Sequence, residues 1–449
     1  MLPDGSRAAM QKRLQLFPDT TRIQDNTLTI NGLSLAALAE EYGTPLYIYD
    51  QATMDASVDA YRAALKKHYP GEAHITYAGK AFLCTAVAEW IRKQQLWADC
   101  TGEGEIAVAR SGGVPRESIV VHGVNKSGGD IQAAENNAGT IVVDNLNELR
   151  TLAERSVDRL PDLWLRLLPG VAVTTHHSHT QTGQHGSKFG MTPAEIAEAV
   201  AICRQAGLLL NGLHFHVGSN FRDAAPLVTA SNVALDLVRG MGFGERWHFS
   251  PGGGWSVAYA EDELPQPVIE EYVRLIALTV AQKCSVARLP LPVLHLEPGR
   301  SLIARAGVAL YRVGAVKRRE DRTWVLVDGG MADNPRHALY GSKYSCLPVT
   351  GPERAATEQV SIAGPYCESG DVLIENLAMP RLEQGNLIAI PASGAYQLSM
   401  ANNYNGARRP AVIWLEEGRS RLIVRRETSE DLLRRDVLQE AAVRQEPGK

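Results

Sequence analysis

The sequence contains few cysteines and no long apolar run. Its six cysteines are scattered over 449 residues, and no two of them form a CxxC pair. In so long a chain this excludes a disulfide framework and favours reduced thiols. No apolar stretch approaches the roughly 20 residues that cross a bilayer, and the N-terminal MLPDGSRAAMQKR lacks the apolar core of a secretory signal. We therefore expect a cytoplasmic protein without a membrane partner.

An excess of positive charge is also missing. The chain carries 46 Lys and Arg against 50 Asp and Glu, for a net charge of −4. A nucleic-acid partner is therefore not expected. The length exceeds the size at which a single hydrophobic core usually stops growing, so two domains are expected.

Short apolar runs alternate with amphipathic stretches of helical length between residues 74 and 296. The runs are 74–78, 96–99, 118–121, 140–143, 163–168, 212–217, 246–249 and 293–296. Buried parallel strands have this apolar character, and each crossover between them needs a helix. The pattern predicts an α/β fold, a (β/α)₈ barrel over residues 45–300.

After residue 305 the runs become short, β-branched and separated by turn residues, which predicts an all-β domain of the sandwich or barrel type. Its expected range is 301–449 together with 1–44. A closing helix is expected to start at Thr428 or Ser429, and the strand–helix–strand pattern near residues 27–49 is expected to pair with this domain.

Unusual residues follow several of the predicted barrel strands, at the end where barrel enzymes place their active sites. Lys80 follows the first strand, where a charge stabilises little. It could be a surface lysine, but a partly desolvated lysine has a lowered pKa and can form a Schiff base. The glycines at 252–254 and Gly299 follow the seventh and eighth strands, where barrels often bind phosphate through backbone N–H groups.

Glu297 stands at the same end of the barrel and could simply pair with Arg300. A Schiff-base lysine beside a phosphate site, however, indicates pyridoxal phosphate, whose ring nitrogen needs an anionic partner. A zinc hydrolase is the alternative, because His214 and His216 lie on one side of a strand. The loop 176–185 adds further histidines to that alternative.

Motifs over nearly the whole chain resemble the fold-type III, pyridoxal-phosphate-dependent amino acid decarboxylases, which have an alanine racemase-like fold. These motifs are YAGKAF, HGVNKS, SKFG, HFHVGSN, GGGWSVAY, EPGRSL, DGGMADNPRHALYG, GPYCESGDVL and GAYQLSMANNYNGARRPA. The resemblance implies a carboxy-lyase that binds pyridoxal 5'-phosphate and no catalytic metal. Trp255 departs from the family pattern, which usually has a smaller residue there, and so does the histidine-rich loop 176–185.

The resemblance also implies a role for each matching residue. Lys80 would form the Schiff base, and Cys367 would be the proton donor. Cofactor contacts would come from Lys80, His216, Ser219, Gly253, Gly254, Glu297, Gly299, Arg300 and Tyr396. Substrate contacts would come from Arg300, Arg336, Tyr340, Glu368 and Tyr396.

The Cys-Glu-Ser loop at 367–369 bears on the substrate. Family members that act on ornithine, lysine or arginine generally have Asp after the cysteine, whereas Glu368 with Arg336 and Tyr340 suits a far end that carries both an amine and a carboxylate. This implies decarboxylation of meso-2,6-diaminopimelate to L-lysine and CO₂, the last step of lysine biosynthesis. A thiol can donate a proton near neutral pH and be recharged from water, although Cys367 could instead be structural.

The resemblance implies a homodimer in which each active site combines residues of both subunits. Four alternatives remain at this point: the metal-dependent barrel hydrolase, a related decarboxylase for another amino acid, a catalytically inactive homologue, and a racemase. A racemase needs a second base, commonly a tyrosine, which the Cys-Glu-Ser loop does not offer.

Overall fold

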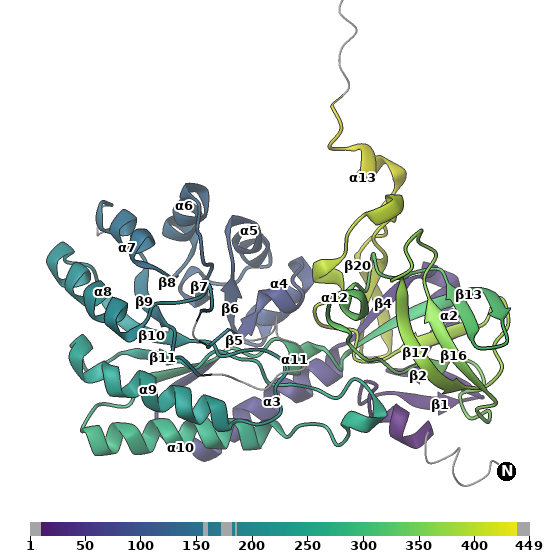
Figure 1. Cartoon of the computed structure of the whole chain (residues 1–449), viewed down its shortest axis with the longest axis horizontal. Helices are drawn as coiled ribbons and strands as arrows, with labels where there is room; N and C mark the ends of the chain where they lie inside the picture. Colours follow the sequence, from purple (N-terminus) through teal and green to yellow (C-terminus); the bar gives the residue numbers. More distant parts are fainter. Residues whose placement is uncertain (1–9, 156–159, 172–181, 185, 438–449) are drawn as a thin grey trace, which may run out of the picture.

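A computed structural model describes residues 10–155, 160–171, 182–184 and 186–437. Figure 1 shows a barrel ringed by helices beside a β domain. Within the described residues, no helix is both long and apolar enough to cross a membrane. Most of the histidine-rich loop lies outside these residues.

Eight parallel strands close the barrel in the order β10-β11-β12-β5-β6-β7-β8-β9. Their bounds are β5 Ala73–Ala78, β6 Trp97–Cys100, β7 Ile119–Val121, β8 Thr140–Val143, β9 Asp162–Leu167, β10 Leu210–Phe215, β11 His248–Ser250 and β12 Val293–Leu296. The ring closes where Leu294 of β12 pairs with Ala73 of β5. The predicted barrel is therefore confirmed.

Helices cover the outside of the barrel. They are α3 Gln51–His68, α4 Thr85–Lys93, α5 Glu103–Ser111, α6 Gly128–Asn137, α7 Leu146–Ala153, α8 Pro193–Ala206, α9 Ala225–Met241 and α10 Ile269–Ala287, with the short α11 Arg300–Ile303 after the last strand. Helix α8 illustrates how the sequence sets the bounds: Thr192 and Glu195 form a capping box, and Gly207 ends the helix in the left-handed conformation.

The β domain is built on a mostly antiparallel nine-stranded sheet. Its strands are β4 Leu46–Asp50, β13 Gly307–Arg318, β14 Thr323–Val327, β15 Leu347–Pro348, β16 Glu358–Ala363, β17 Val372–Met379, β18 Leu387–Ile390, β19 Ala411–Glu416 and β20 Arg419–Val424. A separate three-stranded sheet and further helices belong to it, among them β1 Arg22–Gln24, β2 Thr27–Ile30, β3 Leu33–Ser34, α2 Leu35–Tyr42, α12 Arg336–Tyr340 and α13 Ser429–Leu433. The predicted all-β second domain is thus confirmed.

The N-terminal segment joins this β domain, as its pattern predicts. The predicted division begins the barrel at residue 45, but β4 pairs with β13 and β19 of the second sheet. Helix α13 starts after Thr428, whose side chain accepts a hydrogen bond from the N–H of Asp431. The barrel is therefore inserted between strands of one sheet, which brings the β domain beside the C-terminal ends of the barrel strands.

Candidate active site

A cavity of about 430 Å³ lies at the C-terminal ends of the barrel strands. Twelve of the residues singled out from the sequence line it: Lys80, His214, His216, Ser219, Gly253, Gly254, Glu297, Gly299, Arg300, Arg336, Tyr340 and Tyr396. They come from the barrel and from the β domain, so the cavity lies between the two.

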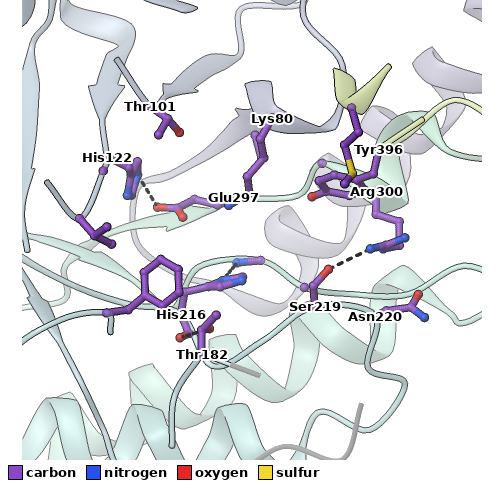
Figure 2. A pocket seen from close by; sticks show the side chains of 18 of the residues that line it. Lys80, Thr101, His122, Thr182, His216, Ser219, Asn220, Glu297, Arg300 and Tyr396 are labelled. Atoms are coloured by element: carbon purple, nitrogen blue, oxygen red, sulfur yellow. Dashed lines mark hydrogen bonds and ion pairs between the residues drawn. The ribbon is translucent and has the colours of Figure 1, made fainter. Parts of the chain in front are cut away.

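Lys80 lies in a single 3₁₀ turn, Gly79–Ala81, directly after β5. Figure 2 shows its side chain projecting toward Glu297, with His216 beyond. Its Nζ atom is 4.0 Å from Oδ2 of Asp99. Burial opposes the ammonium charge, but Asp99, Tyr396 and Glu297 outweigh it and raise the pKa of Lys80. The expectation of a lowered pKa is therefore wrong for the cofactor-free protein.

Asp99, at the end of β6, is one of three buried charged or titratable residues that the sequence reasoning missed. Burial raises the pKa of Asp99 to about 7, although Lys80 lowers it. His122 follows β7 and Arg166 lies on β9, and both line the cavity. A polar residue at the end of an apolar strand was the available signal, and it is the same signal that identified Lys80 and Glu297.

Glu297 follows β12 and is 6% exposed. It accepts a 2.6 Å hydrogen bond from Ser250, and its other oxygen lies 3.2 Å from Nε2 of His214. Burial alone would raise the pKa of Glu297, but His214, His122 and Ser250 together leave it well below its ordinary value. Glu297 is therefore an ionised carboxylate inside the cavity.

The two histidines of the metal alternative have different partners. His214 faces Glu297, whereas Nδ1 of His216 accepts a hydrogen bond from the N–H of Gly253 at 3.2 Å. Burial lowers the pKa of His216 well below its ordinary value, so the ring is neutral. His122, His214 and Glu297 each place one possible ligand atom within 4.8 Å of the others. Among the described residues, the group that could hold a cation therefore contains His122 and not His216.

The glycines at this end of the barrel allow segments to approach closely. A Cβ atom on Gly253 would lie 2.0 Å from the carbonyl oxygen of Glu297, and one on Gly254 would lie 2.1 Å from that of Gly218. Gly254 also has a φ of +106°. Side chains are excluded at these positions, so backbone groups line the cavity there.

Two buried arginines have no carboxylate within 4.0 Å in the described part of the chain. Arg300 and Arg336 are 5% and 4% exposed, and their partners are hydroxyl groups. Arg300 donates to Tyr259 and to Ser219, while Arg336 donates to Tyr344 at 2.7 Å. Nε of Arg300 is buried without a hydrogen-bond partner in the same part of the chain. Such a pair needs an anion, because a buried charge is costly unless it is paired.

Tyr396 brings the β domain to the lysine. Its N–H donates to the carbonyl of Ala81 at 2.8 Å, and its ring lies 4.7 Å from the guanidinium carbon of Arg300. It has a φ of +61°, which is uncommon for a non-glycine residue. Strain of this kind persists where surrounding contacts enforce it, and here the contact with Ala81 fixes the tyrosine beside Lys80.

Cys367 and Glu368 do not belong to the described lining of this cavity. Both are exposed, on a loop between β16 and β17. The loop is well held: the carboxylate of Asp371 accepts from the N–H groups of Met331 and Tyr366, and Asn405 accepts from the N–H of Cys367. The loop is therefore a fixed feature that faces outward from its own chain.

The charges around the cavity suit pyridoxal phosphate. Its described lining includes five cations, Lys80, Arg166, Lys188, Arg300 and Arg336, and a single carboxylate, Glu297. Such a cavity favours a ligand with a phosphate and carboxylates, and Glu297 can serve as the one anionic partner for a protonated ring nitrogen. The residues that are present therefore fit this cofactor.

Trp255, one of the departures from the family pattern, does not face the cavity. Its ring is buried and packs 4.8 Å from that of Tyr272 and 6.1 Å from that of Phe221. Of loop 176–185, Thr182 lines the cavity, and its hydroxyl donates to the backbone carbonyl of His216 at 2.8 Å. The larger side chain at position 255 is therefore accommodated in the barrel core.

The sequence is similar to those of known pyridoxal-phosphate-dependent enzymes. Residues 55–304 match the family model described as "Pyridoxal-dependent decarboxylase, pyridoxal binding domain". Diaminopimelate decarboxylase of Actinosynnema pretiosum subsp. auranticum is 39% identical over 427 residues, covering 94% of this chain and 95% of the relative. The enzyme of that name from Bacillus subtilis (strain 168) is 38% identical over 438 residues, covering 94% and 98%.

A solved structure shows the same architecture. The crystal structure of diaminopimelate decarboxylase from M. jannaschii in complex with L-lysine has a TM-score of 0.85 and 30% identity, and the match covers 94% of this chain and 98% of that one. The family model also matches more than half of the chain. The chain belongs to the diaminopimelate decarboxylases, a family of pyridoxal-phosphate-dependent carboxy-lyases.

Proposed function

We propose that the chain decarboxylates meso-2,6-diaminopimelate to L-lysine and CO₂, as the last step of lysine biosynthesis. The observation that carries this proposal is the pair of buried arginines at the cavity, Arg300 and Arg336, which lack a carboxylate partner in the described part of the chain. A substrate with a carboxylate at its far end supplies that partner. Ornithine, lysine and arginine have no carboxylate at the end remote from the reacting carbon.

The residues of the barrel would hold the cofactor. Lys80 would bind its aldehyde carbon, Glu297 would keep the ring nitrogen protonated, and the neutral ring of His216 would stack on the cofactor ring. Backbone groups at Gly253, Gly254 and Gly299, together with Ser219, would bind the phosphate. When bound, pyridoxal phosphate supplies the sink for the electron pair that the departing CO₂ leaves behind.

Residues of the β domain would bind the far end of the substrate. Arg336 and Tyr340 would bind its carboxylate with Arg300, which with Tyr396 would also contact the cofactor. A guanidinium can bind a carboxylate through two parallel hydrogen bonds, which adds selection by geometry. Glu368 would bind the far ammonium group, so the complete site would recognise both charges of a zwitterionic end.

Cys367 would donate the proton that replaces CO₂. Cys367 is not among the described residues that line the cavity of its own chain. The loop that carries it is exposed and held outward by Asp371 and Asn405. This supports a homodimer in which Cys367 and Glu368 of one subunit complete the site that contains Lys80 of the other. A closed two-fold arrangement makes the two shared sites equivalent. A cytoplasmic location, where thiols stay reduced, suits a catalytic cysteine.

The test is to incubate the purified protein with meso-diaminopimelate, L-lysine, L-ornithine and L-arginine in turn, and to measure CO₂ release. We expect release from meso-diaminopimelate to exceed the others by a factor on the order of 10³, since the site's buried charges stay unpaired with the wrong substrate. Preferred release from one of the other three amino acids would disprove the proposal and leave a related decarboxylase as the function.

A further inference from the structure

Tyr259 lies between the two unpaired arginines. It follows β11 in the barrel and is 2% exposed. Its hydroxyl accepts a hydrogen bond from Nη1 of Arg300. The guanidinium carbon of Arg336 lies 4.7 Å from the centroid of the same ring, and that of Arg300 lies 5.6 Å from it. One buried tyrosine therefore contacts two cations at once.

The cations reach this ring from different domains. Arg300 starts the short helix α11 after the last barrel strand, whereas Arg336 starts helix α12 of the β domain. Tyr344, also from the β domain, packs edge-on against Tyr259 with ring centroids 5.5 Å apart, and its hydroxyl accepts from Arg336. Tyr259 therefore connects the barrel to the β-domain arginine.

The segment around Tyr259 is itself fixed. The N–H of Tyr259 donates to Glu263 at 2.7 Å, and the N–H of Ala258 donates to Gln266 at 2.9 Å. Next to them, Glu261 pairs with the largely buried Arg13, which also donates to the carbonyl of Ala378 on β17. The tyrosine thus has little freedom to move away from either cation.

We propose that Tyr259 is a positioning residue that holds Arg300 and Arg336 in place to bind one carboxylate between them. The proposal rests on the proposed function, since that carboxylate is the far one of the substrate. Two buried like charges repel each other, and an aromatic face stabilises a nearby cation more strongly where water is excluded. The ring therefore offsets the repulsion without neutralising the charge that the substrate must meet.

This role explains why the residue is aromatic and also polar. The ring face attracts Arg336, and the hydroxyl satisfies one donor of Arg300. An acidic residue in the same position would pair with the arginines permanently and compete with the substrate. A neutral partner leaves them able to bind an anion.

The experiment compares two ligands that differ only at the far end. L-Lysine, the product, keeps the carboxylate that the arginines would bind, whereas cadaverine is the same diamine without it. Their dissociation constants are measured by calorimetry on the holoenzyme for the parent, Tyr259→Phe and Tyr259→Leu. Tyr69→Phe is the matched control, because Tyr69 is a buried tyrosine whose hydroxyl donates to the carbonyl of Pro292, outside the cavity lining.

We expect Tyr259→Phe to weaken L-lysine binding about tenfold, as for the loss of one hydrogen bond to a charged group, and Tyr259→Leu to weaken it roughly 50-fold because the ring is lost as well. Cadaverine binding should change less than threefold in both variants, and Tyr69→Phe should leave both ligands unchanged. If both Tyr259 variants keep the parent's preference for L-lysine, or weaken both ligands equally, the proposed role is wrong. A parent protein that does not prefer L-lysine over cadaverine would instead disprove the far-carboxylate site of the proposed function.

Discussion

The ammonium group of Lys80 lies 4.0 Å from the carboxylate of Asp99, at the ends of two neighbouring barrel strands. Asp99 is 3% exposed, and it is the only acidic group within 4.0 Å of this ammonium among the described residues. The pair thus places a titratable carboxyl beside the reactive lysine.

Asp99 should make stability depend on pH. Its pKa is raised from 3.8 to about 7 by burial, so between these values the folded protein binds a proton that the unfolded chain has released. The contribution of Asp99 to the free energy of unfolding is therefore present below pH 4 and is lost as pH rises to 7. As pH rises over this range, we expect the free energy of unfolding of Asp99→Asn to increase by about 2–4 kcal/mol relative to that of the parent.

Urea denaturation of cofactor-free parent and variant at intervals from pH 4.5 to 7.5 measures this gain. Asp236→Asn is the control, because Asp236 lies on the surface of α9 and its side chain is 69% exposed. Its difference from the parent should stay constant. If the free energies of unfolding of Asp99→Asn and the parent change with pH in the same way, the raised pKa of Asp99 is contradicted.

Borohydride should attach the cofactor to Lys80. Two other lysines serve for comparison: Lys188 lines the cavity, and the side chain of Lys126 is 1% exposed and has three acceptors, including Glu148 at 2.7 Å. We expect peptide mass spectrometry to find the reduced adduct on Lys80 alone, and Lys80→Ala to lose activity by a factor on the order of 10³. Lys188→Ala should still carry the adduct on Lys80. An adduct on Lys126 or Lys188 in the parent would overturn the assignment.

Arg336→Ala should impair turnover and spare the cofactor. Losing one partner of a buried charged contact typically costs about 2–5 kcal/mol, so kcat/KM for meso-diaminopimelate should fall roughly 30-fold or more. The visible absorbance of the bound cofactor should stay at the parent's value. Arg150→Ala is the control, since Arg150 is a surface residue paired with Glu198. An unchanged kcat/KM in Arg336→Ala would remove this arginine from the site.

Mixing two inactive variants tests the shared site. In a heterodimer of Lys80→Ala and Cys367→Ala subunits, one of the two shared sites would contain both substitutions and the other would contain neither. After complete exchange of an equal mixture, about a quarter of the parent's activity should return, because half of the dimers are mixed and each has one intact site. Native mass spectrometry confirms exchange. If exchange occurs and activity stays absent, the loop of Cys367 acts within its own chain.

The sequence predicts the barrel and much of its cavity for a physical reason. Parallel strands buried on both faces are apolar, so Lys80 and Glu297 are conspicuous where such strands end. The same reasoning would have found Asp99 and His122. Strand ends do not point to Tyr396, which was expected only from the family resemblance, because the bond from its N–H to Ala81 joins residues more than 300 positions apart and no local pattern encodes that contact.

The charge state of Lys80 was also beyond the sequence. Burial lowers the pKa of a lysine, but a neighbouring anion raises it, and the direction of the net shift depends on which of the two effects is larger. Asp99 makes the largest contribution to the raised pKa of Lys80, with Tyr396 and Glu297, and the position of Asp99 follows from strand order in the closed barrel. Tyr259 was missed for a similar reason: its partners are far from it in the sequence, and Arg336 meets it only after the two domains have packed.

The position of β4 has a consequence for how the chain is synthesised and folded. This strand pairs with β13 on one side and with β19, residues 411–416, on the other. As the chain leaves the ribosome, the barrel strands at 73–296 emerge long before the last partner of β4 is made. The barrel can therefore form before β19 is available to pair with β4. Until then β4 has an unpaired edge, and such edges are prone to pair with other chains. A chain truncated before residue 411 would keep every barrel strand and still expose this edge, so we expect its defect to be aggregation and not loss of the barrel.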